Sequence, residues 1–290
     1  MKRMSEKVLF ERLMRFSCAN GQVEEVQTLL SQGVDLNAPD KNGYTPLHYA
    51  VLSGNKELIE ILAQHGADLD ARDNRGKTPL HYAVRGSKSG TIQALVEAGA
   101  DVDVQDKQGY SPLHFAVEGK NLKGIEILSI AGADLDIKDQ YGQTPLHWAS
   151  FYGDKYVVQK LIHEGAGLNE VNSKGRTALE YAVLTNHKEA AYMLLDHGAD
   201  PYLMNEQGGS SFALMNRKKA FQDMVDFYDL GKKSTNKPES QLVQKSAQET
   251  QLAENQASRG LLNKIANFGE KITSQNDKNV LTRDDFSRTV

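Results

Sequence analysis

The sequence is poor in the features that mark several large classes of protein. It has 290 residues but only one cysteine, Cys18, which excludes an intrachain disulfide framework and a zinc site built from several cysteines. It has no run of about 18 apolar residues, so we expect no membrane-spanning helix. The charged start of the chain leads into no apolar segment, so we expect no secretory signal peptide. The formal net charge of -4 leaves no basic excess for bulk nucleic-acid binding.

Catalytic signatures are also missing. The Gly-Lys-Lys-Ser at 231–234 lacks the leading glycine of a phosphate-binding P-loop, and it lies in a polar stretch. The chain has no H-E-x-x-H, no G-x-S-x-G and no strand-borne G-x-G-x-x-G motif. Cys18 falls at an apolar helical position, where we expect a buried, inert thiol rather than a nucleophile. We therefore predict a protein that is not an enzyme and that uses no cofactor or metal.

What the sequence does have is an internal repeat of 33 residues. The segment Thr45-Pro46-Leu47-His48 returns at Thr78, Ser111 and Thr144, and in decayed form at Thr177. One glycine column keeps the same step, at Gly43, Gly76, Gly109, Gly142, Gly175 and Gly208. One leucine column also keeps it, at Leu29, Leu62, Leu95, Leu128, Leu161 and Leu194. Several columns in one register indicate a repeat architecture.

A single unit can be interpreted from its own residues. Residues 40–43, Asp-Lys-Asn-Gly, have the composition of a turn. Thr45 suits a helix N-cap and Pro46 suits the first helical position, where its missing N–H is not needed. Apolar residues then follow helical spacing over 47–51 and again over 58–62. The unit is turn, helix, turn, helix, and it can bury its apolar face only if several copies stack.

This repeat resembles the ankyrin repeat family over about residues 10–230. The resemblance implies an all-α repeat solenoid of helix-turn-helix units with hairpin-like fingers. We expect five full repeats, at about 38–70, 71–103, 104–136, 137–169 and 170–202. An N-terminal cap at about 5–37 and a C-terminal cap at about 203–230 complete a predicted domain spanning 1–230. End units of this kind are expected to have a wetter outer face.

Residues 231–290 break the repeat. Residues 231–259 have almost no large apolar side chains, so we predict a disordered tail. Within it, residues 260–273 place Leu261, Ile265, Phe268 and Ile272 at helical spacing, which predicts a short amphipathic helix. That helix is a candidate for docking on the repeats, on a partner or on a membrane surface. The tail carries a net charge of +3, whereas the rest of the chain carries -7.

The histidine column has the residue type of a metal site but the wrong spacing. Zinc needs histidine nitrogens at about 2.0–2.1 Å, whereas neighbouring helices pack about 8–10 Å apart, so adjacent copies cannot share one ion. We expect each histidine to bond to local hydroxyl or backbone groups and to tie neighbouring loops together, as the ankyrin resemblance also implies. These residues are His48, His81, His114 and His147.

An aromatic column also steps by 33 residues. A cofactor site would not repeat with the scaffold, so we expect these rings to pack in the core between repeats. They are Phe16, Tyr49, Tyr82, Phe115, Trp148 and Tyr181.

Positions that vary between copies are the candidates for binding, because the scaffold does not demand them. In the ankyrin family, partner contacts come mainly from hairpin tips and the exposed part of the first helix. Tyr and Arg often carry binding energy, and exposed aromatic clusters are otherwise costly in water. Basic tips on an acidic body suit a partner with acidic residues near an apolar patch. The predicted protein-binding residues are Tyr44, Lys77, Arg85, Tyr110, Tyr141, Phe151, Tyr152 and Arg176.

The sequence therefore predicts a non-catalytic, cytoplasmic scaffold or adaptor that captures a partner protein through the concave face and finger tips of an ankyrin stack. No nucleic-acid partner is expected, and peripheral membrane contact through 261–272 is a weaker alternative. By analogy of architecture alone, the polar tail also suits a bacterial effector delivered into a host cell, with the tail as secretion signal. An enzyme with an unrecognised site is the remaining alternative.

Overall fold

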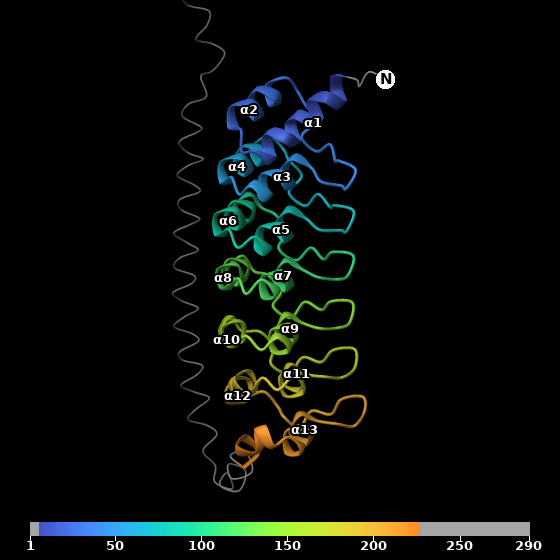
Figure 1. Ribbon diagram of the computed structural model, residues 1–290, viewed down its shortest axis with the longest axis vertical. Helices are drawn as coiled ribbons and strands as arrows, with labels where there is room; N and C mark the ends of the chain where they lie inside the picture. Colours follow the sequence, from blue (N-terminus) through green and yellow to red (C-terminus); the bar gives the residue numbers. More distant parts are fainter. Residues whose placement is uncertain (1–5, 227–290) are drawn as a thin grey trace, which may run out of the picture. The chain divides into compact units, whose positions relative to one another are not determined.

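The computed structural model describes residues 6–226, and these form a stack of helix pairs with fingers projecting along one side (Figure 1). The predicted tail disorder, the predicted helix at 260–273 and the secretion-signal hypothesis all concern residues outside this range. None of the described helices is long and apolar enough to cross a bilayer.

The helices form two parallel columns in Figure 1, which we call the inner and the outer column. The inner column lies beside the fingers and contains α1 (Glu6–Ala19), α3 (Pro46–Ser53), α5 (Pro79–Arg85), α7 (Pro112–Glu118), α9 (Pro145–Tyr152), α11 (Ala178–Leu184) and α13 (Ser211–Arg217). The outer column contains α2 (Val23–Ser31), α4 (Lys56–Gln64), α6 (Ser89–Ala98), α8 (Leu122–Ile130), α10 (Lys155–Glu164) and α12 (Lys188–Asp196). A 3-10 turn, η1 (Lys219–Phe221), follows α13.

Four of the inner helices, α3, α5, α7 and α9, begin as the sequence predicts. Thr45 is the N-cap of α3 with extended backbone angles, and Pro46 is the first helical residue. The same arrangement recurs at Thr78, Ser111 and Thr144. The local sequence alone therefore sets where four of the inner helices start.

The fingers are closed turns stacked on one another rather than paired strands. Among residues 6–226, the bridge between Met204 and Ser210 is the only β-type pairing. Gly43 turns the first finger with φ +87°, and a Cβ there would lie 2.7 Å from the backbone nitrogen of Asn74 in the next finger. The Asn74 N–H also donates to the Asn42 carbonyl at 2.9 Å. Glycine is required at this position because the next finger packs directly against it.

The core runs as a continuous column through the stack. Inner helices pack on inner helices and outer helices on outer ones, as α3 does on α5 and α4 on α6. Each buried leucine contributes about 1.5–3 kcal/mol of apolar transfer free energy, counted against an extended chain. One such fully buried column is Leu47, Leu80, Leu113, Leu146 and Leu179.

The two end units differ in their outer surfaces. In the N-terminal cap, α1 is 14 residues long and buries Met14 in register with the core, but Leu9, Leu13 and Phe16 are exposed. The predicted wetter outer face is therefore wrong for this end, because α1 has no preceding repeat to cover its apolar side. The C-terminal cap buries Met215 and Phe221 and exposes mainly polar side chains of α13, as predicted.

Candidate protein-binding surface

The histidine column holds the fingers in place. The backbone N–H of Thr45 donates to His48 Nδ1 at 3.2 Å, so the ring proton lies on Nε2, which donates to the Lys77 carbonyl at 3.2 Å. The other three rings repeat this geometry, with Nε2 at 2.9, 3.1 and 2.8 Å from the carbonyls of Tyr110, Gln143 and Arg176. The predicted structural role of the histidines is confirmed. Each histidine sets the position of a finger residue in the following repeat.

Burial keeps these histidines neutral. It lowers the pKa of His48, His114 and His147, and it lowers the pKa of His81 to about 4. Their finger acceptors include Lys77, Tyr110 and Arg176, three of the predicted binding residues. The neutral rings therefore fix the backbone positions of these residues at the candidate surface.

Buried carboxylates close the fingers from inside. Asp73 Oδ1 accepts the backbone N–H groups of Arg75 and Lys77, both at 2.8 Å. Its Oδ2 accepts the Tyr82 hydroxyl at 2.6 Å, which ties the finger to the helix behind it. Fingers held by backbone, carboxylate and histidine bonds lose little freedom when a partner binds.

A chain of contacting rings lies beside the third and fourth fingers. The centroid of Tyr110 lies 4.7 Å from that of Trp148, and Trp148 lies 6.2 Å from Tyr152. Tyr152 lies 5.6 Å from Phe151, which lies 6.1 Å from Tyr181. Phe151 and Tyr152 are 48% and 44% exposed, whereas the other three rings are half-buried. We call Tyr110, Trp148, Phe151, Tyr152 and Tyr181 the aromatic cluster.

A group of cations adjoins this cluster. Lys77 Nζ lies 4.1 Å from the centroid of the Phe115 ring, and Phe115 also contacts Tyr110 at 6.1 Å. Burial lowers the pKa of Lys77; the charge of Asp106 opposes this shift, and the charges of Arg85 and Arg75 add to it. We call Arg75, Lys77 and Arg85 the cationic patch. Phe115 is buried, and it connects the patch to the aromatic cluster through its contacts with Lys77 and Tyr110.

The structure brings together only some of the predicted binding residues. Tyr110, Phe151 and Tyr152 belong to the aromatic cluster, and Lys77 and Arg85 to the cationic patch. Tyr141 is 54% exposed on its finger, but its ring stacks on no other ring of the described residues. Tyr44 occupies a finger two repeats before that of Tyr110.

Two of the predicted residues have structural partners. The Tyr44 hydroxyl lies 3.0 Å from that of Tyr82, and its ring is half-buried. Arg176 Nε lies 3.2 Å from Oε1 of Glu180, a buried carboxylate that also accepts a bond from Asn205 Nδ2 at 2.7 Å. Tyr44 therefore packs against the next repeat, whereas Arg176 forms an ion pair within its own repeat.

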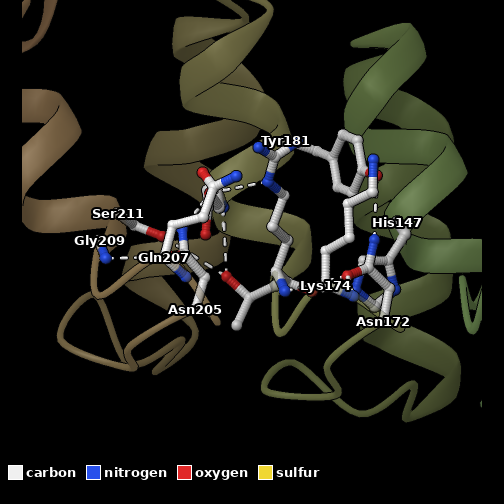
Figure 2. A network of polar contacts seen from close by, with 11 residues as sticks. His147, Asn172, Lys174, Tyr181, Asn205, Gln207, Gly209 and Ser211 are labelled. Carbon is white, nitrogen blue, oxygen red and sulfur yellow. Dashed lines mark hydrogen bonds and ion pairs between the residues drawn. The ribbon is translucent and has the colours of Figure 1, made fainter.

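Figure 2 shows the polar network around this last contact, between the repeats that carry α9, α11 and α13. On one side, Asn172 Nδ2 donates to the Tyr181 hydroxyl at 3.0 Å. On the other, Asn205 Oδ1 accepts the backbone N–H groups of Gln207 and Gly209 at 3.0 and 2.9 Å. The network shows that the side chains near Arg176 fasten one repeat to the next.

Sequence reasoning missed two members of the aromatic cluster, because it assigned the whole aromatic column to the core. Phe115 is buried as expected, but Tyr49, Tyr82, Trp148 and Tyr181 are half-buried. The expectation is wrong for Phe16, which is 60% exposed because no finger or earlier repeat lies over it. A usable signal was Trp148 itself, the only tryptophan of the chain, where other copies have Tyr or Phe.

Groups that could react lie outside this surface. Cys18 is fully buried, and burial raises the pKa of its thiol to about 12, so the predicted inert thiol is confirmed. Within residues 6–226, no three His, Cys, Asp or Glu side chains gather in a way that could hold a metal ion. The chemistry of the surface is therefore that of aromatic rings and free cations.

Comparisons with known proteins agree with the fold. A family model described as "Ankyrin repeats (3 copies)" matches residues 11–73, 70–139 and 113–205. The solved ankyrin repeat domain of Bcl-3, described as a unique member of the IkappaB protein family, is similar with a TM-score of 0.69. That match has 24% sequence identity and covers 73% of this chain and 96% of the Bcl-3 chain. No curated protein matches the chain significantly. The chain belongs to the ankyrin repeat family.

Proposed function

We propose that the protein is a non-catalytic scaffold or adaptor that captures a partner protein on its finger face, the surface formed by the fingers and the inner helices. The observation that carries this proposal is the aromatic cluster, whose rings form one contiguous, partly exposed surface. Aromatic residues dominate binding hot spots, and clustered exposed rings in a lone protein lose free energy to water. A partner that covers them would remove that cost.

The rigidity of the fingers supports the same function. The four fingers that contain Lys77, Tyr110, Gln143 and Arg176 are each held by a buried histidine, a buried carboxylate or amide, and a backbone bond to the neighbouring finger. A surface that is already ordered loses little conformational entropy on association, so more of the contact energy remains as affinity. The arrangement suits a folded surface or an extended peptide, since it extends over several repeats.

The test compares how much partner protein is captured by two variants of the full chain, one with three substitutions and one with two. Tyr141→Ala, Phe151→Ala and Tyr152→Ala together remove exposed rings from the finger face. Tyr156→Ala with Tyr192→Ala removes rings that are 59% and 57% exposed on the outer helices α10 and α12. Quantitative mass spectrometry of pulldowns from the cells that contain the protein measures what each form retains.

We expect the finger-face variant to retain at least tenfold less of each specific partner than the parent chain. The outer-helix variant should retain as much as the parent chain. A hot-spot ring typically contributes about 2 kcal/mol or more, which corresponds to a loss of that size. Equal recovery by both variants would show that the finger face is not the binding surface.

A further inference from the structure

We propose that the finger face binds a protein segment in which acidic residues and large apolar side chains are separated by about three to six residues. The carboxylates would face the cationic patch, and the apolar side chains would enter the aromatic cluster. This inference rests on the proposed function, because it specifies the partner of the same surface.

The cationic patch has no acidic partner within the described chain. No carboxylate of residues 6–226 lies within ion-pair distance of Arg75, Lys77 or Arg85, whereas Lys123, for example, pairs with Glu126 at 2.7 Å on an outer helix. Other outer-helix lysines are paired as well, as Lys56 is with Glu60 and Lys160 with Glu164. Three neighbouring cations without internal partners are complementary to carboxylates from outside.

The charges of Asp106 and Asp73 act on Lys77, but neither carboxylate forms an ion pair with the patch. Asp73 is buried, with one oxygen on two backbone N–H groups and the other on the Tyr82 hydroxyl. Asp106 is buried too, and its Oδ1 accepts the backbone N–H groups of Gln108 and Tyr110. They reduce the positive potential around Lys77, but the exposed side chains of Arg75 and Arg85 have no ion-pair partner among residues 6–226.

Phe115 and Tyr110 make the two regions one site. Lys77 lies over the Phe115 ring, Phe115 contacts Tyr110, and Tyr110 contacts Trp148 at the start of the aromatic cluster. The exposed rings, Phe151 and Tyr152, lie at the far end of that chain of contacts. A single segment that crosses the third repeat would therefore contact the cations at one end and the rings at the other.

The spacing of the two features follows from the repeat. Arg85 and Phe151 occupy the same position of their repeats, two units apart, and neighbouring helices pack about 8–10 Å apart. An extended chain advances about 3.3 Å per residue, so one to two repeats correspond to about three to six residues. Glu118 occupies the same position in the repeat between them. Its negative charge, which acts on Tyr152, interrupts the basic track that a nucleic-acid backbone would need and restricts the partner's carboxylates to the end of the site that contains Arg75, Lys77 and Arg85.

The test uses the fluorescence of Trp148, because it is the only tryptophan and lies in the aromatic cluster. The probes are synthetic peptides of about 12 residues with three aspartates and a Leu-Phe-Leu triplet, separated by a Gly-Ser spacer of about three to six residues. Control peptides replace the aspartates by lysine or the triplet by serine. A single-stranded DNA oligonucleotide is titrated in parallel with the full-length protein.

The variant Arg85→Glu inverts the exposed charge of the patch, and Arg217→Glu makes the same change at an exposed arginine of α13. We expect the acidic–apolar peptide to shift Trp148 fluorescence saturably, and both control peptides to bind at least tenfold more weakly. Arg85→Glu should weaken binding at least tenfold, whereas Arg217→Glu should leave it within about twofold. Circular dichroism establishes that both variants are folded.

Several outcomes would overturn the inference. They are equal binding of the lysine peptide, no binding of any acidic–apolar peptide, unchanged affinity of Arg85→Glu, or tighter binding of DNA than of peptide. If the finger-face variant still loses its partners in the pulldown while one of these outcomes holds, only the partner chemistry is wrong. If the finger-face variant retains its partners, the proposed function fails independently of the peptide result.

Discussion

At the first four junctions between repeats, a buried histidine joins an inner helix to the next finger, whereas at the fifth a buried glutamate takes that position. His114 Nε2 bonds to the Gln143 carbonyl, but Glu180 Oε1 accepts the side-chain amide of Asn205 at 2.7 Å. The finger residue at 205 is Asn rather than Asp, as it also is at 172, where the junction still uses His147. An aspartate at 205 would put two carboxylates face to face. The comparison shows that this position can hold either a donor that bonds to a finger carbonyl or an acceptor that bonds to a finger side-chain amide.

The two kinds of junction respond to pH in opposite directions. Burial lowers the pKa of the four histidines, so their contribution is complete above the unfolded value of about 6.5 and is lost as pH falls through the lowered pKa. Burial raises the pKa of Glu180, so its contribution is complete below the unfolded value of about 4.3 and declines as pH rises through the raised pKa. Acid therefore weakens the first four junctions and not the fifth.

The largest expected effect tests this pH contrast. Because the pKa of His81 falls from 6.5 to about 4, charging that ring alone removes about 3 kcal/mol of stability between about pH 6.5 and pH 4. His81→Gln should therefore lose less free energy of unfolding than the parent chain when the pH falls from about 6.5 to 4. Urea unfolding at successive pH values measures the difference, and subtracting the two curves removes the carboxylates common to both. Parallel curves would contradict the contrast.

The next effect compares deletion at the two junctions. His114→Ala leaves the Gln143 carbonyl without its donor and opens a cavity, so we expect a loss of about 2–4 kcal/mol. Glu180→Gln keeps an oxygen that accepts from Asn205 and removes a charge that burial disfavours, so we expect a change within about 1 kcal/mol. Urea unfolding at neutral pH followed by circular dichroism compares them. Similar losses in both variants would show that the Glu180 charge is as important as the histidine bonds.

A smaller effect concerns the one aspartate finger whose aromatic partner has no donor. Asp40, Asp73 and Asp139 accept from Tyr49, Tyr82 and Trp148, but Phe115 faces Asp106, whose buried Oδ2 has no hydrogen bond. Phe115→Tyr should supply the missing hydroxyl and raise the free energy of unfolding by about 1 kcal/mol. The reverse change, Tyr82→Phe, should cost a similar amount. Thermal unfolding of both variants checks this, and a destabilised Phe115→Tyr would refute it.

The smallest effect concerns the loops beneath the fingers. Asp103 Oδ1 accepts the Asp134 backbone N–H at 3.0 Å, and Asn169 makes the same bond to Asp200 at 2.8 Å. Burial, and then the charges of Asp134 and Asp101, raise the pKa of Asp103, so its charge is unfavourable at neutral pH. Asp103→Asn should therefore stabilise the chain by about 0.5 kcal/mol at pH 7, after allowance for solvent screening. The gain should vanish below the unfolded pKa of about 3.9, and a gain that persists there would exclude the electrostatic cause.

Much of the architecture was predictable because the same sequence signals recur in every repeat. Thr45 and Pro46 mark a helix start that recurs at fixed spacing, and the geometric limit on metal ligands already indicated a structural role for the histidines. The candidate surface was less predictable. Arg176 and Tyr44 have the composition and position of binding residues, yet Arg176 pairs with Glu180 of its own repeat and Tyr44 contacts Tyr82 of the next repeat.

The sequence by itself determined the period, the helix boundaries, the buried columns and the family, since these depend on local propensities and on contacts that repeat identically. Only the tertiary structure decided which variable side chains share one surface. That outcome depends on contacts between non-equivalent positions of neighbouring repeats, such as Lys77 over Phe115 and Phe151 against Tyr181. No single repeat contains both members of such a pair, so spacing along the chain does not reveal them.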